Sequence, residues 1–404
     1  MAAKRKRKID WTPSKRKWTP KGEINGVNAN TLCWNSEPAV VGSAHGLLRT
    51  PGQRPLRIGS HCTGWATEGL ALESMNIPHT HSFACDKERS VEILLRECFD
   101  IGIFFRDATH PDSVALAPEV DLYLNGWPCQ PHSSMGDRRG PEDNRALLVD
   151  YMIQYLAQKL PRCFILENVA SALEKRFKPW MDAIMETLRS LKESSGESAY
   201  EIFSTVCDSK DAGLPQRRKR LYIIGARKKF YGVTHNNPNF RWPYQVKPCT
   251  LESILDKNED ETLVMGDGAT SDPSLMTPTV LRNLENVWKK MLKHDVDPTQ
   301  YHIIVDIAAS KTRPNFHIEG ICPTITKQRG GCQGFFNTFV NRRLTVSEMI
   351  RLQGASPDRF VKGVSKIGSR AMGRICGNAM SPPVVQRILQ NLLPSVGLVR
   401  FHDG

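Results

Sequence analysis

Residues 163–167 are Cys-Phe-Ile-Leu-Glu, an apolar run that ends in a carboxylate. The same pattern occurs upstream, where residues 81–86 are His-Ser-Phe-Ala-Cys-Asp. Short apolar runs of this kind predict buried strands, and the amphipathic segments between them predict helices. We expect strands at 56–60, 81–86, 121–125, 163–167, 200–207 and 220–225, and helices at 66–76, 87–99, 146–160 and 179–192. This alternation predicts an α/β fold with a doubly wound, mostly parallel sheet.

The regular alternation stops after residue 225, which divides the chain of 404 residues into unlike parts. The next stretch is richer in Pro, Asn, Gly and acids, and helical periodicity returns at 279–293, 345–353 and 382–393. We expect four parts: a basic tail and lead-in at 1–55, the α/β domain at 56–225, a smaller lobe at 226–340, and a segment at 341–404 that returns to the α/β domain. Ligands of a doubly wound sheet bind at the carboxyl ends of its strands.

The overall composition is that of a chain able to bury a core, with 40% apolar and 24% charged residues. No run of 18 apolar residues occurs, so no transmembrane helix is expected. The first ten residues, MAAKRKRKID, do not lead into an apolar stretch, so no secretory signal is expected. The chain has 11 cysteines and no CxxC pair, which favours free thiols and predicts no structural metal.

Positive charge is concentrated in the first 21 residues, which contain nine Lys or Arg and one Asp, a net charge of 9 − 1 = +8. The whole chain carries +13, so the remainder is only mildly basic. Two basic clusters with a short spacer fit a nuclear import signal, a nucleic-acid tether, or both. The tail therefore predicts a nuclear protein, although a solvated tail without either role has the same composition.

Three polar groups follow predicted strands and are candidates for chemistry. Cys129 lies on a Pro-flanked turn after the strand at 121–125, and a rigid turn presenting one thiol suits a nucleophile. Glu167 ends the next strand, where partial burial favours a general acid. Arg218 and Arg220 are two residues apart, so they share one face of a regular strand. Taken singly, each has a plain alternative: a structural thiol, a helix-cap residue and a basic strand edge.

The motifs PCQ at 128–130, ENV at 167–169 and QRRKR at 216–220 together resemble those of the cytosine-5 DNA methyltransferases. Further blocks agree with this family: GLPQ at 213–216, RRLT at 342–345, RLQG at 351–354 and GNAMSPP at 377–383. The resemblance covers about 56–225 and 341–393. It implies the fold of the class I S-adenosylmethionine-dependent methyltransferases, with a target-recognition lobe at 226–340.

The resemblance also implies the reaction, which is transfer of a methyl group from S-adenosylmethionine to carbon 5 of a cytosine in double-stranded DNA. The base is flipped out of the helix into the pocket. By this resemblance, Cys129 attacks carbon 6, Glu167 protonates or hydrogen-bonds the adjacent ring nitrogen, and Arg218 orients the base. The residues expected to bind the substrate are Ser133, Gln216 and Arg220.

The residues expected to bind the methyl donor are Cys62, Gly64, Trp65, Asp86, Asp107 and Asn378. Asp86 is placed to bind the ribose hydroxyls, and Asp107 matches the acid that the family uses near the adenine. The turn at 61–67 departs from the family's glycine-rich FxGxGG pattern, since only Gly64 remains in its core. Trp65 is therefore expected either to block the donor or to stack on its adenine.

The segment 226–340 matches no motif, but its first part interleaves basic residues with Tyr231, Phe240, Trp242 and Tyr244. This mixture suits a nucleic-acid face and equally an ordinary solvated loop. Residues 328–334, QRGGCQG, are expected to form a flexible glycine loop able to enter a groove.

Two alternatives remain open from the sequence. One is a tRNA-directed enzyme of the same family, and the other is a catalytically silent nucleic-acid-binding regulator. The basic tail favours a nuclear DNA enzyme over the first, and intact Cys129, Glu167 and Arg218 argue against the second.

Overall fold

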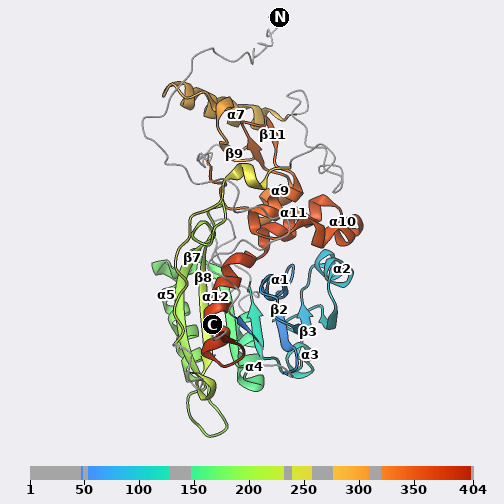
Figure 1. Ribbon diagram of the computed structural model, residues 1–404, viewed down its shortest axis with the longest axis vertical. Coiled ribbons are helices and arrows are strands. Elements are labelled where there is room, and N and C mark those ends of the chain that lie inside the picture. Colours follow the sequence, from blue (N-terminus) through green and yellow to red (C-terminus); the bar gives the residue numbers. More distant parts are fainter. Residues whose placement is uncertain are drawn as a thin grey trace, which may run out of the picture.

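The computed structural model describes residues 47–48, 53–127, 147–231, 239–256, 276–309 and 320–401. A seven-stranded sheet forms its centre, with strand order β4-β3-β2-β5-β6-β8-β7 (Figure 1). Neighbouring strands are parallel except at β8, which is antiparallel to both β6 and β7. The strands are β2 (Leu56–His61), β3 (His79–Cys85), β4 (Ile101–Phe105), β5 (Leu122–Asn125), β6 (Cys163–Val169), β7 (Tyr200–Asp208) and β8 (Lys219–Arg227). The predicted α/β fold with a mostly parallel sheet is confirmed.

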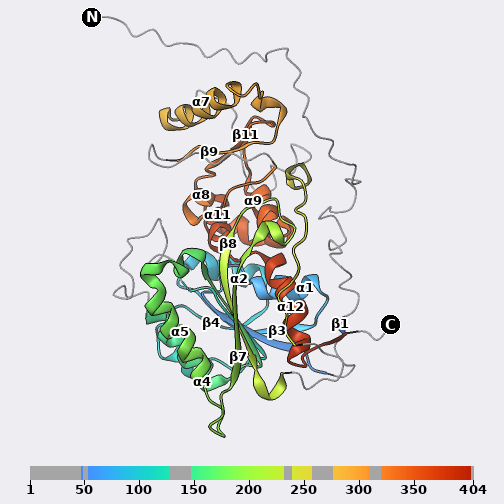
Figure 2. The same cartoon turned by 90° about the vertical axis from the view of Figure 1, so that its left-hand side faces the viewer.

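Helices cover both faces of the sheet, which explains why its central strands are apolar throughout rather than alternating. On one face Ile165 packs with α1 (Thr67–Ser74) and α12 (Pro382–Ser395). On the other face its neighbours Phe164 and Leu166 pack with α4 (Leu147–Lys159) and α5 (Lys178–Ser190). Figure 2 shows these two pairs of helices on opposite sides of the sheet.

A third core joins the α/β domain to the C-terminal helices. Residues of α2 (Arg89–Cys98) pack there with α9 (Val346–Gln353), α10 (Val361–Ile367) and α11 (Ser369–Asn378). Helix α9 begins with a capping box, in which Thr345 and Glu348 satisfy each other's backbone amides. The segment after 341 thus extends the α/β domain and also supplies α12 to its sheet.

A smaller core lies beyond these helices, at the end of the molecule that carries α7 and β9 in Figure 1. Helix α7 (Pro278–Leu292) covers a three-stranded antiparallel sheet of order β11-β10-β9. These strands are β9 (Ile304–Asp306), β10 (Phe335–Asn337) and β11 (Arg342–Arg343). Other parts of the predicted lobe pack elsewhere: Phe240 joins the core beneath α12, and Leu251 and Ile254 join the third core.

Several elements were not expected from the sequence. Strand β4 is one, and it lies at the edge of the sheet with a partly exposed pattern. Helices α10 and α11 are others, as are the short helices α3 (Asp112–Ala115) and α8 (Lys327–Gly331) and the pairing of β1 (Leu47–Leu48) with β12 (Arg400–Phe401). Among the described helices, none is long and apolar enough to cross a membrane.

Candidate functional site

A cavity of about 930 Å³ opens at the carboxyl ends of β2, β3, β5 and β6. Residues from the predicted site that line it are Cys62, Gly64, Asp86, Asp107, Glu167, Arg218, Arg220 and Asn378. Strand ends bring the first five together, because parallel strands deliver their last residues to the same edge of a sheet, and Arg218 and Arg220 lie at the start of antiparallel β8. Its opposite wall comes from α8 and from the end of α11.

Glu167 lies near the end of β6, is buried, and is a diagonal neighbour of Arg220 in the β6–β8 pair, where its direct partner is Tyr222. Arg220 Nε is 3.1 Å from Glu167 Oε1. Burial raises the pKa of Glu167 above its ordinary value, although Arg220 and Arg218 oppose the change. The carboxyl group therefore keeps its proton to higher pH than a solvated glutamate, as a general acid near neutral pH requires.

Arg218 lines the same cavity, but its guanidinium is engaged by the backbone. Nη1 donates to the carbonyls of Ile325 (2.8 Å) and Gly377 (3.3 Å), and Nη2 donates to that of Ala379 (2.7 Å). Burial lowers the pKa of Arg218 to about 10. This arginine thus ties β8 to the segment before α8 and to the end of α11, whereas Arg220 is the cation beside Glu167.

Gln216 does not reach the cavity, which corrects its predicted role in substrate binding. Its side chain is fully buried, and Nε2 donates to the Leu352 carbonyl at 3.1 Å. The Gln-x-Arg-x-Arg motif therefore combines a packing glutamine with two cavity-facing arginines. Motif position alone does not separate these roles.

The two acids expected at the donor side differ in their surroundings. Asp86 follows β3, and its carboxylate accepts hydrogen bonds from the backbone amides of Gly64 (3.1 Å) and Glu88 (3.0 Å). Burial raises the pKa of Asp86, and these two amides oppose the shift. Asp107 follows β4, is exposed, and accepts from the amide and hydroxyl of Thr109, which hold its pKa below the usual range.

The turn between β2 and α1 takes left-handed backbone conformations at alternate residues, with φ of 53° at Cys62, 59° at Gly64 and 59° at Ala66. Such values are unusual for residues with a Cβ. The turn thus has the left-handed backbone conformations that favour glycine, although two of the three residues, Cys62 and Ala66, are not glycine.

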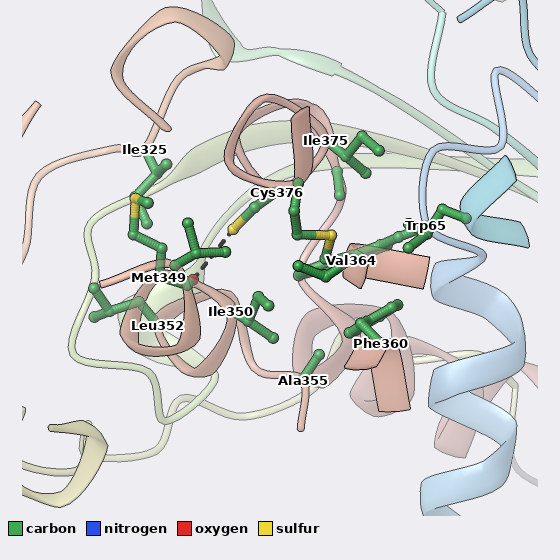
Figure 3. Close-up of a cluster of buried hydrophobic side chains, with 14 of the residues drawn as sticks. Trp65, Ile325, Met349, Ile350, Leu352, Ala355, Phe360, Val364, Ile375 and Cys376 are labelled. Atoms are coloured by element: carbon green, nitrogen blue, oxygen red, sulfur yellow. Dashed lines mark hydrogen bonds between the residues drawn. The ribbon is translucent and has the colours of Figure 1, made fainter. Parts of the chain in front are cut away.

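Trp65 contradicts the expectation that it contacts the donor. Its side chain is fully buried, stacks on Phe360 at 5.4 Å between ring centroids, and lies in the cluster drawn in Figure 3. Its Nε1 donates to Thr67 Oγ1 (3.0 Å) and to the Met380 carbonyl (3.2 Å). The indole is absent from the described cavity wall, so it neither blocks the cavity nor stacks in it.

The predicted flexible loop at 328–334 is also corrected. Helix α8 begins at Lys327, and Gly330 packs so closely on Gly373 of α11 that an added Cβ would lie 1.9 Å from the Gly373 carbonyl oxygen. Arg329 of α8 pairs with Asp306 of β9 at 2.9 Å, and Lys327 pairs with Glu88 at 2.8 Å. The glycines here allow two backbones to touch rather than a loop to move.

Three of the four aromatic residues named at 231–244 pack against the sheet or one another. Phe240 is buried, packs on Phe203 of β7 at 5.0 Å between ring centroids and on Trp242 at 5.1 Å, and Tyr231 also contacts Phe203. Tyr244 alone of the four is widely exposed, at 84%. These rings bind the segment to the sheet.

Cys129 and Ser133 lie outside the described residues, as does the basic tail. The sequence reasoning missed Glu68, Lys327 and Arg374, which line the cavity. Glu68 comes directly after the turn at 61–67, so its place in the sequence already indicated this site, whereas α8 and α11 reach the cavity only through tertiary packing. No group of three or more His, Cys, Asp or Glu that could hold a metal is found within the described segments.

Comparison with known proteins gives a consistent result. Residues 58–393 match the family model of the C-5 cytosine-specific DNA methylases. The type II methyltransferase M.HaeII of Haemophilus aegyptius is 27% identical over 286 residues, which cover 70% of this chain and 76% of that protein. The orphan methyltransferase M.SPRI of Bacillus phage SPR is 36% identical over 57% of this chain and 54% of its own length. The solved structure of the Entamoeba histolytica methyltransferase EhMeth aligns with a TM-score of 0.56 at 16% identity, covering 84% of this chain and 98% of that one.

Proposed function

The chain belongs to the C-5 cytosine-specific DNA methylase family and is a DNA (cytosine-5-)-methyltransferase, and we propose that its donor is S-adenosylmethionine and its acceptor double-stranded DNA. One observation carries the proposal. The donor-side acids Asp86 and Asp107 and the pair of Glu167 and Arg220 open onto the same cavity of about 930 Å³. A volume of this size lies at the upper end of ordinary ligand pockets, so it suits a donor and a flipped base together.

The donor side fits S-adenosylmethionine in its polar groups. Asp86 is anchored by two backbone amides, which fixes its carboxylate at the strand end where ribose hydroxyls bind. Asp107 and Asn378 line the same space. When bound, S-adenosylmethionine supplies an electrophilic methyl group. The chain's own residues bind and orient the donor.

The base side fits a cytosine that needs protonation at a ring nitrogen. Glu167, whose pKa burial raises, donates that proton, and Arg220 stabilises the carboxylate left behind. Arg218 positions this pair by fixing the start of β8 to three carbonyls. We assign the nucleophile to Cys129 on its PCQ motif, and phosphate or base contacts to Ser133 on the same segment.

The test is transfer of tritiated methyl from S-adenosylmethionine to duplex DNA, to tRNA and to no acceptor, in one purified preparation. We expect label in duplex DNA at cytosine only. Label confined to tRNA would transfer the proposal to RNA, and donor binding without label in either acceptor would favour a silent binding protein.

We further propose that the protein acts in the nucleus. The support is the tail of nine basic residues and one acid at 1–21, which fits an import signal. A fluorescent fusion of residues 1–21 should accumulate in nuclei of a eukaryotic cell. A diffuse signal would overturn this localisation.

A further inference from the structure

A buried carboxylate that the proposed function does not use lies on the cavity wall. Glu68 is in the first turn of α1, is 1% exposed, and lines the cavity beside Ser60 and Thr67. A glutamate is almost never so deeply buried unless it is paired. Glu68 lines a ligand cavity and is not enclosed in a hydrophobic core, so packing alone does not explain its burial.

Two neighbours keep this carboxylate charged. Ser60 Oγ donates to Glu68 Oε1 at 2.5 Å, and Nε2 of buried His81 lies 3.1 Å from the same oxygen. Burial alone raises the pKa of Glu68, but His81 and Ser60 bring it below the usual value. Both of these side chains approach Oε1, and a backbone hydrogen bond at Glu68 also stabilises the carboxylate. A carboxylate oriented in this way resembles a preorganised acceptor.

The other acids on this side of the cavity are differently placed. Asp86 already accepts two backbone amides, and Asp107 is exposed and held by Thr109. Glu88 pairs with Lys327. Glu68 is the most deeply buried of these four acids, so its charge is the least screened by water.

We propose that Glu68 binds the cationic methionine end of the donor, through the sulfonium or the α-ammonium group. The inference rests on the proposed use of S-adenosylmethionine. Glu68 stands two residues after Ala66, one of the positions where this turn has replaced glycine. A carboxylate here places a negative charge beside the cavity.

The test compares binding of S-adenosylmethionine and of S-adenosylhomocysteine, which lacks the sulfonium charge, by calorimetry on the full-length chain. Glu68→Gln should weaken S-adenosylmethionine binding about 10- to 100-fold, the loss of one charge-assisted hydrogen bond. A larger loss for S-adenosylmethionine than for S-adenosylhomocysteine assigns the contact to the sulfonium. Equal losses assign it to the ammonium.

The matched control is Glu73→Gln on the same helix, where the carboxylate is exposed and pairs with Arg359; its affinity for both ligands should equal that of wild type. If Glu68→Gln does not fold, the double variant Glu68→Gln with His81→Gln leaves no buried charge unpaired and takes its place. Unchanged affinity for both ligands in a folded variant overturns the inference. Failure of the wild-type chain to bind S-adenosylmethionine instead overturns the proposed donor.

Discussion

Substitution of Gly373 by alanine tests the contact that forms the far wall of the cavity. A Cβ on Gly373 would lie 2.2 Å from the Gly330 carbonyl oxygen, and an ordinary contact begins near 3.4 Å. Helices α8 and α11 must therefore separate by roughly 3.4 − 2.2 = 1.2 Å, and because the obstacle is backbone, no side-chain rotation relieves it. Overpacking of this kind costs about 1–3 kcal/mol.

Calorimetry of thermal unfolding measures this loss of stability. At about 2–4 °C per kcal/mol for a domain of this size, Gly373→Ala should lower Tm by roughly 2–12 °C. The separation also displaces Lys327 of α8 and Asn378 of α11, which line the cavity, so donor affinity should fall. Gly69→Ala is the control, since its nearest neighbour is at 3.6 Å and alanine favours a helix by up to about 1 kcal/mol. A Gly373→Ala variant that melts with the wild type would refute the close crossing of α8 and α11.

Four further outcomes are expected. Glu167→Gln should lower single-turnover methyl transfer about 10²–10⁴-fold. Because burial raises the pKa of Glu167, the wild-type rate should fall as pH rises through that pKa. A Glu167→Gln variant whose rate still falls with pH in the same way would point to another acid. Cys129→Ser should abolish transfer while DNA binding, measured by fluorescence anisotropy, persists; near wild-type turnover would contradict its assignment as nucleophile. Asp86→Ala should weaken S-adenosylmethionine binding by about 1.5–3 kcal/mol in calorimetry, and an unchanged affinity would remove it from the donor site. Deletion of residues 1–21 should make DNA affinity less dependent on salt, since each lost phosphate contact changes the slope of log affinity against log salt by about 0.9. Equal slopes for the full-length and shortened chains would show that the tail does not contact DNA.

The sequence predicts the sheet well where strands are buried on both faces. The run at 163–167 is apolar because helices cover both sides of β6, and its terminal Glu167 emerges at the cavity. Strand β4 escaped prediction because an edge strand with partly exposed residues lacks that signal. Helix α11 escaped because Gly373 and Gly377 lower helix propensity, yet both are needed where α11 touches the backbone of α8 and Thr326.

Motifs predicted which residues belong to the site more reliably than they predicted what each side chain contacts. Asp86 and Glu167 line the cavity because strand ends fix them there. Gln216 in the QRRKR motif and Trp65 in the turn at 61–67 are buried away from the cavity, and nothing in their local sequence indicates this. Lys327 reaches the cavity because α8 packs on α11, and its partner Glu88 lies 239 residues away in the sequence. Local sequence patterns do not encode contacts over such a separation.

The turn at 61–67 adopts left-handed backbone conformations at two residues that are not glycine. Left-handed conformations at Cys62 and Ala66 cost roughly 1–2 kcal/mol each, so the surroundings must hold them. Thr63 Oγ1 accepts from the Cys85 amide at 2.9 Å, and the Thr63 amide donates to the Cys85 carbonyl at 3.0 Å, which pins the turn to β3. Trp65 anchors its other end by stacking on Phe360 and donating to Thr67 and Met380. Burial of an indole contributes about as much as the strain of both residues together, since its removal typically costs about 3–5 kcal/mol. The tryptophan that the sequence suggested as an obstacle to the donor is therefore the residue that holds the donor turn in shape.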